Sequence, residues 1–168
     1  MLLLLLAAAF TDGPAPRLAP PSGTEVVSQA FSFLGRPYGA AQQRGPDLDC
    51  SGFVKEVYGR LGVRLPPVSR EQARRGSPVE FDSLVPGDLV FFSSRTSGPG
   101  RVGHVGIIAS VDGKGRTWMI HSSTRGIRLD TVGHSKRGRY ICARRILERP
   151  ATDTTSPPLD LEAAVTER

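Results

Sequence analysis

The sequence predicts an α+β fold in which helices come first and an antiparallel sheet follows. In the first half of the chain, apolar residues recur at the three- and four-residue spacing of amphipathic helices, as over residues 50–61. Beyond residue 84 the pattern changes to short apolar runs between glycine-containing turns, which is typical of strands. Helices followed by a run of strands favour α+β over a doubly wound parallel sheet. We expect N-terminal helices packed on an antiparallel sheet of about five to six strands.

The chain has 168 residues, enough for one domain with a core. Residues 1–22 open with an apolar run, Met1–Phe10, and continue into a proline-rich stretch, so we expect a secretory signal and a linker there. The run is too short to span a membrane. The folded domain is expected over residues 23–148, and residues 149–168, which offer little to bury, are expected to form a disordered tail. Export to the periplasm, cell wall or medium follows as an expectation.

The charge balance indicates an anionic partner. The net charge is +6 and the pI is about 10.0. Nucleic acid is the first class to consider, but the sequence has no zinc-ligand spacing, no basic helix and no alternation of aromatic and basic residues. We therefore expect an anionic polymer such as a cell wall as partner, with no nucleic acid and no stable membrane insertion.

Three helices are expected in the first half of the chain. Residues 23–35 carry one apolar face, with Thr24 as the N-cap. The second helix is expected to start at Asp49, whose short carboxylate suits an N-cap, and to end before Gly62, which suits a left-handed C-terminal cap. A short third helix is expected with Ser69 as its cap.

The strands are expected in the second half. The Asp112-Gly113 pair predicts a hairpin between the second and third of them. Five apolar runs are predicted to form strands: Leu89–Phe92, His104–Ala109, Thr117–His121, Gly126–Leu129 and Tyr140–Ile146.

Cys50 is the candidate nucleophile because it falls in the first turn of the second helix. Backbone N–H groups are unpaired there, and the helix dipole stabilises negative charge, so this position is expected to lower the pKa of a thiol. Ser51 and Gly52 are small enough for a substrate carbonyl to approach the sulfur. The structural alternative is a buried cysteine at a helix start.

A nucleophilic cysteine needs a base, and the base needs an orienting group. His104 and His121 lie on neighbouring predicted strands of one hairpin, so they are expected within reach of each other, His104 as base and His121 as its orienting partner. Tyr38 is expected to donate to the developing oxyanion, and His134 to be solvated. A cysteine and two histidines without closely spaced ligand pairs do not favour a metal site, so no metal and no cofactor are expected.

The ordered motifs of the chain resemble the NlpC-type cell-wall cysteine peptidases over roughly residues 26–146. The resemblance rests on Asp49–Val54, Leu65-Pro66, Ser69, Gln72, Pro86–Phe92, Gly103–Ile107 and Ile120–Ser123. It implies a papain-like fold and an endopeptidase that acts on peptidoglycan stem peptides. The bond implied joins D-Glu, through its γ-carboxyl, to a diamino acid.

The resemblance also implies roles for individual residues. It places the catalytic cysteine at Cys50, the histidine at His104, the third polar residue at His121 and the loop tyrosine at Tyr38. Asp49 and Ser51 match positions that help to recognise a free amine of the substrate. The chain departs from the family at Ala41-Gln42, where glycines are common, and at Pro67, where arginine is common.

Two further interpretations remain open. An amidase or acyltransferase on the same scaffold would share the thiol–imidazole chemistry, and an inactive wall-binding module would need none of it. Retention of Cys50, His104 and His121 argues against the module. We expect a monomer, and we expect Cys142, on the last predicted strand, to be a structural thiol rather than half of a disulfide.

Overall fold

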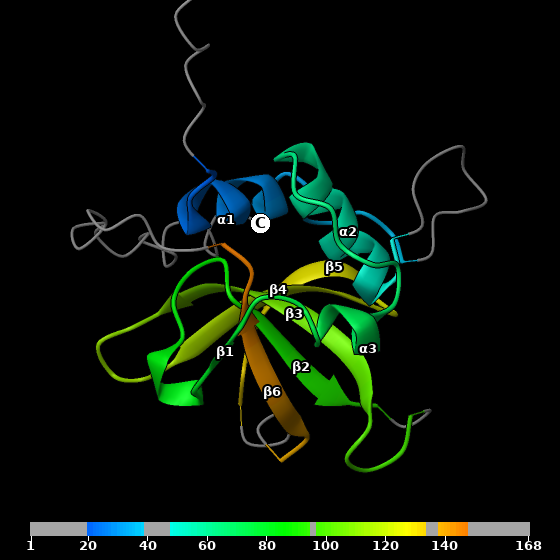
Figure 1. Cartoon of the computed structure of the whole chain (residues 1–168), viewed down its shortest axis with the longest axis vertical. Helices are drawn as coiled ribbons and strands as arrows, with labels where there is room; N and C mark the ends of the chain where they lie inside the picture. Colours follow the sequence, from blue (N-terminus) through cyan, green and yellow to red (C-terminus); the bar gives the residue numbers. More distant parts are fainter. Residues whose placement is uncertain (1–19, 39–47, 95–96, 134–137, 148–168) are drawn as a thin grey trace, which may run out of the picture.

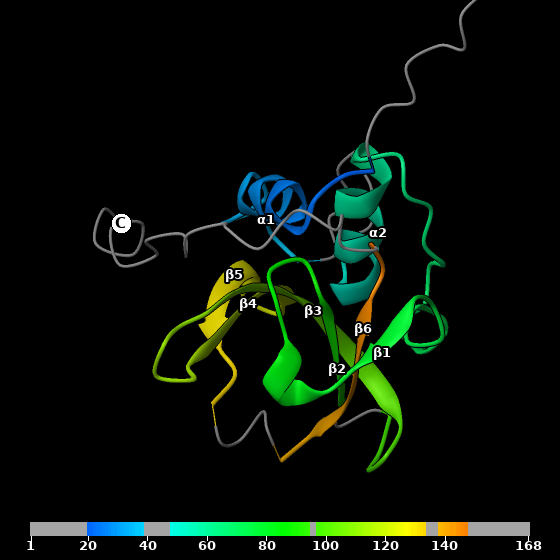
Figure 2. The same ribbon diagram turned by 60° about the vertical axis from the view of Figure 1, so that its left-hand side comes forward.

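The computed structural model describes residues 20–38, 48–94, 97–133 and 138–147. The expected signal and most of its linker, the Ala41-Gln42 loop, His134 and the C-terminal tail lie outside these ranges. The described part forms two layers. The helices α1 (Gly23–Phe31) and α2 (Cys50–Arg60) lie side by side over one face of a sheet, and the short α3 (Ser69–Gln72) lies near the start of β3 (Figures 1 and 2).

The sheet has six strands in the order β1-β6-β2-β3-β4-β5, and every neighbouring pair is antiparallel. This confirms the predicted α+β class and the expected arrangement of helices on an antiparallel sheet. None of the helices in the described ranges is long and apolar enough to cross a membrane. The strands are β1 Ser77–Val79, β2 Leu89–Ser93, β3 Val102–Val111, β4 Thr117–Ser123, β5 Gly126–Thr131 and β6 Tyr140–Arg145.

The start of α1 corrects the predicted cap. Ser22, not Thr24, is the N-cap: its side chain accepts from the Glu25 N–H, and the Glu25 carboxylate accepts from the Ser22 N–H at 2.7 Å. This reciprocal capping box occupies two backbone donors, which explains why the helix begins at Gly23. The helix also ends earlier than predicted, at Phe31, and turns lead on to Gly35, whose φ is 81°.

Helix α2 forms where it was predicted. The Asp49 carboxylate caps it by accepting from the Gly52 N–H at 2.6 Å, and Gly62 follows its C-terminus with a φ of 78°. Its buried face, on which the sheet and α1 pack, consists of Ser51, Phe53, Val54, Val57 and Tyr58.

Two elements differ from the prediction between α2 and β2. Ser69 is the first residue of α3 rather than its cap, because the N-cap position is occupied by Val68, which makes no side-chain cap. The strand β1 was not predicted. It has three residues and contains Pro78, and both features suit an edge strand that pairs on one side only, here with β6.

The core of the domain lies between the helices and the sheet. Along β3, Val105, Ile107 and Ala109 point into the layer shared with the helices, while Ile108 belongs to a smaller cluster on the other face. This alternation is the two-residue period of a strand. A bulge between Phe92 and Ser93 of β2 interrupts the register next to the start of β3.

The turn before β2 fixes the helical layer to the sheet. The Tyr58 hydroxyl donates to the Gly87 carbonyl, and the Gly23 Cα lies against Gly87, where a Cβ would stand 2.7 Å away. Next to it, Asp88 is 2% exposed and accepts from both Nε and Nη2 of Arg145, each at 2.8 Å. This bidentate pair joins the turn to the last strand of the sheet.

Candidate active site

Cys50 lies at the first position of α2, as predicted, and its helix start is brought against β3. Its side chain is half-buried, and the backbone N–H groups of Val105, Ser51 and Cys50 itself favour the ionised form of the thiol. Val105 is the residue that follows His104. The fold therefore brings the predicted nucleophile to the segment of β3 that carries the predicted base.

The pKa of the Cys50 thiol departs from the expectation. Burial, and then the nearby Asp49 carboxylate, raise this pKa above its ordinary value, and the three backbone N–H groups only partly oppose the rise. The helix start does supply the expected donors, but the cost of a buried thiolate next to a carboxylate is larger. An acceptor for the thiol proton must therefore be close at hand when the thiolate forms.

The structure brings the two predicted histidines together. His104 Nε2 lies 2.8 Å from His121 Nδ1, and the two rings meet edge to face with centroids 4.9 Å apart. His121 is 5% exposed. Gly106 makes room for this contact, because a Cβ there would lie 3.3 Å from the His121 Cβ.

Asp130 is a further member of this group, and it was missed in the sequence. Its Oδ2 lies 3.0 Å from His121 Nε2, and its Oδ1 accepts from Arg128 Nε at 3.0 Å. A signal for it did exist. The two-residue turn at Thr124-Arg125 fixes the β4–β5 register so that His121 pairs with Arg128, and alternate residues of a strand share a face.

Hydrogen bonds link His104, His121 and Asp130 in series, and the carboxylate of Asp130 determines which nitrogen atoms carry protons. A carboxylate only accepts, so His121 must carry its proton on Nε2 and present the lone pair of Nδ1. His104 must then donate from Nε2 to that lone pair, which leaves Nδ1 as the unprotonated nitrogen of its ring. The series therefore holds His104 as a neutral base whose accepting atom is Nδ1.

The three residues predicted to bind substrate differ in their surroundings. Tyr38 is 46% exposed and ends the described segment before α2. Asp49 Oδ1 accepts both from the Gly52 N–H and, at 3.0 Å, from the Ser51 hydroxyl. Ser51 is 4% exposed. The Ser51 hydroxyl therefore orients the Asp49 carboxylate.

The start of α2 is also tied to α3. The buried Gln72 donates through Nε2 to the Ser51 carbonyl at 3.0 Å and to the Pro66 carbonyl at 2.8 Å. These bonds hold the backbone next to Cys50.

Cys50 and Cys142 are both free thiols, and burial raises the pKa of Cys142 within β6.

The family model described as NlpC/P60 family matches residues 35–145. A probable endopeptidase of Mycobacterium tuberculosis is 34% identical over 151 residues, which cover 80% of this chain and 36% of that protein. A gamma-D-glutamyl-L-lysine dipeptidyl-peptidase of Bacillus cereus is 36% identical over 132 residues, covering 76% of this chain and 37% of that protein. The chain thus spans little more than a third of the length of these relatives.

Solved structures show the same fold. An NlpC/P60 family protein from Bacillus cereus superposes with a TM-score of 0.65 at 32% identity and covers 77% of this chain and 42% of its own. The NlpC/P60 domain of the peptidoglycan hydrolase SagA gives a TM-score of 0.56 at 26% identity, and the match covers 74% of this chain and 99% of that domain. The predicted papain-like arrangement is confirmed.

Proposed function

This chain belongs to the NlpC/P60 family, and from that premise we propose that it is a peptidoglycan hydrolase, a thiol-dependent endopeptidase that cuts a peptide bond in the cell-wall stem peptide. The observation that carries the proposal is the hydrogen-bonded series His104–His121–Asp130 beside a cysteine at a helix start. Together they supply a nucleophile, a base and a group that orients the base, the three parts that acyl transfer by a thiol requires.

The reaction follows from the arrangement of protons. His104 Nδ1 takes the proton from the Cys50 thiol, and the thiolate attacks the carbonyl carbon of the scissile bond. The resulting oxyanion is stabilised by backbone N–H groups at the start of α2 and by the Tyr38 hydroxyl. The C–N bond breaks as the imidazolium returns its proton to the leaving amine. Water, deprotonated by His104, then hydrolyses the thioester and restores the thiol.

The raised pKa of Cys50 fits this sequence of steps. A thiol that is protonated at rest gives up its proton only as His104 accepts it, so attack and proton transfer are linked. The imidazolium that forms is stabilised through His121 by the Asp130 carboxylate. His121 and Asp130 act as positioning residues in this scheme.

We assign the bond to the γ-linkage between D-Glu and a diamino acid. Support comes from the Bacillus cereus relative, whose name specifies a gamma-D-glutamyl-L-lysine linkage. Asp49, oriented by Ser51, is the group suited to pair with a free substrate amine. A site of action outside the cytoplasm, in the periplasm or cell wall, follows from the substrate.

Digestion of purified peptidoglycan fragments tests the proposal. We expect the wild type to release new free amino groups on the diamino acid, identified by mass spectrometry, and Cys50→Ala and His104→Ala each to release essentially none, since parts of a catalytic unit fail together. Release of the intact stem from the sugar would instead indicate an amidase. Binding of fragments without any product would indicate a wall-binding module.

A further inference from the structure

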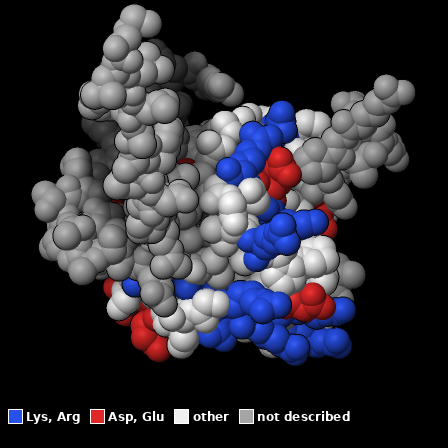
Figure 3. Space-filling model, turned by 45° about the horizontal axis from the view of Figure 1, so that its top comes forward, with Lys and Arg blue, Asp and Glu red and all other residues white. Residues whose placement is uncertain are grey.

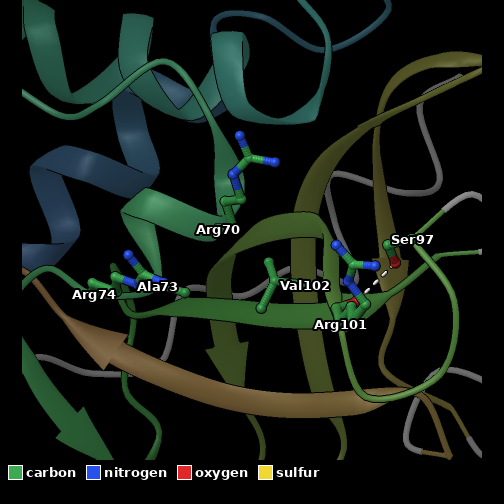
Figure 4. Close-up of a pocket in the computed structure, with 6 residues that line it drawn as sticks. All are labelled: Arg70, Ala73, Arg74, Ser97, Arg101 and Val102. Atoms are coloured by element: carbon green, nitrogen blue, oxygen red, sulfur yellow. Dashed lines mark hydrogen bonds between the residues drawn. The ribbon is translucent and has the colours of Figure 1, made fainter.

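A cavity of about 580 Å³ lies between α3 and the start of β3, and its lining is strongly basic. Arg70 and Arg74 extend from α3 and the turn after it, and Arg101 extends from the segment before β3, with Val102 between them (Figure 4). Ala73 and Ser97 complete the lining, so within the described residues it holds three arginines and no carboxylate.

These three arginines differ from others in the domain. Arg60, Arg128 and Arg145 each contact a carboxylate at 3.0 Å or less. In the described ranges, the guanidinium groups of Arg70, Arg74 and Arg101 form no ion pair and are exposed. On the face drawn in Figure 3, Lys and Arg gather in broad patches with few acidic side chains between them.

The walls of the cavity are held in place. Ser97 Oγ donates to the Arg101 carbonyl at 2.7 Å, and a Cβ at Gly103 would lie 2.3 Å from Ser94 Oγ, so the loop is packed closely against the strand. On the other wall, Arg144 Nε donates to the Ala73 carbonyl at 2.6 Å. The basic groups therefore project from a fixed backbone.

Both walls are connected directly to the catalytic centre. Gln72, within α3, is bonded to the Ser51 carbonyl next to Cys50. Val102 stands two residues before His104, about 7 Å along the strand at the usual rise per residue. A substrate whose scissile carbonyl lies at Cys50 would therefore place its neighbouring groups within reach of the cavity.

The geometry points to an anion-binding subsite formed by Arg70, Arg74 and Arg101, which holds an oxyanion of the cell wall next to the scissile bond. Guanidinium groups bind carboxylates and phosphates through paired, charge-assisted hydrogen bonds. The oxyanion is either a carboxylate of the stem peptide or a phosphate of an anionic wall polymer. This inference rests on the proposed action on peptidoglycan.

The test compares two triple variants of equal charge, each made in the Cys50→Ala background so that binding is measured without hydrolysis. One is Arg70→Gln/Arg74→Gln/Arg101→Gln. Its matched control is Arg64→Gln/Arg75→Gln/Arg125→Gln, which removes three exposed arginines that do not line the cavity. Titration calorimetry uses three probes: a stem peptide with free carboxylates, the same peptide with its carboxylates amidated, and a peptide-free poly(glycerol phosphate).

We expect the cavity variant to bind at least one anionic probe about tenfold or more weakly than the control, since a charge-assisted hydrogen bond is worth roughly ten- to a hundredfold in a binding constant. Loss confined to the free-carboxylate peptide identifies the stem peptide as the source, and loss with the phosphate polymer identifies the wall polymer. Equal binding by both variants overturns the subsite. Absence of hydrolysis by the wild-type enzyme would instead count against the proposed function, and the binding comparison would stand.

Discussion

Asp130 shows how much of the proposed chemistry depends on a residue that acts through another side chain. It is linked to His104 through His121, and the direction of both hydrogen bonds in that series follows from its being a carboxylate. An amide at the same position could donate to His121 and so permit the opposite tautomer. The Asp130 carboxylate thus determines the tautomer of His104, although His121 lies between them.

Asp130→Asn is expected to lower kcat by roughly 10²–10⁴-fold, as the loss of an orienting carboxylate does in related nucleophile–histidine systems, with KM nearly unchanged. Steady-state kinetics on a stem-peptide substrate measures both. A purely structural role would instead lower the melting temperature and leave the kcat of the folded fraction intact. A kcat within a factor of about two of the wild type would contradict the assignment.

Asp49→Asn is expected to lower the pKa of the Cys50 thiol. The Asp49 carboxylate is the second largest cause of the raised value, after burial, and asparagine keeps the N-cap while removing the charge. A lower thiol pKa means that thiolate appears at lower pH, so the pH profile of alkylation by iodoacetamide should shift toward acid. The measurement is made in a Cys142→Ala background, where Cys50 is the only thiol. A profile that stays in place or moves toward alkaline pH would refute this.

The elements were predictable to the extent that their signals are local. The cap at Asp49, the left-handed Gly62 and the hairpin that joins His104 to His121 all depend on residues close in sequence. Ser22 and Glu25 also form a local signal, a serine with glutamate three residues later, and that one was overlooked. Asp130 was missed because the predicted strand ended at Leu129, two residues before the end of β5.

The pairing of distant elements was not predictable in the same way. Strand β6 lies between β1 and β2, although some fifty residues separate β2 from β6 in sequence. The spacing of apolar residues along the chain does not predict that β6 pairs with β1 and β2. The arginine-lined cavity depends on the same kind of contact, because α3 and the start of β3 approach each other only in the folded chain. The thiol pKa was misjudged for a related reason, since burial is a property of the whole packing.

The Asp88–Arg145 pair is the clearest link between elements, and Asp88→Ala is expected to lower the free energy of unfolding by about 3 kcal/mol, because removal of one partner leaves the other uncompensated. Urea unfolding followed by circular dichroism measures the change. Glu56→Ala, which breaks the exposed pair with Arg60 on α2, is the control and should cost no more than about 1 kcal/mol. Similar losses of unfolding free energy in the two variants would show that the burial of the Asp88–Arg145 pair does not increase its contribution to stability.

At the scale of the whole molecule, the net charge of +6 is expected to assist retention on an anionic wall. Binding of Cys50→Ala to isolated cell walls should weaken as salt rises, because exposed charges are screened beyond about 8–10 Å near physiological ionic strength. A sedimentation assay over a series of salt concentrations measures the bound fraction. Binding that is constant from low to high salt would remove the electrostatic contribution.

The position of β6 has a consequence for biosynthesis. Of the strands in the described ranges, the one latest in sequence occupies an interior place in the sheet, between β1 and β2. A growing chain that has reached residue 131 already carries the cysteine, both histidines and the aspartate, but β2 still has an open edge and β1 has no neighbour. The domain therefore completes its sheet only when residues 140–145 have emerged, so a chain interrupted before them carries all four residues of the proposed site on an unfinished sheet.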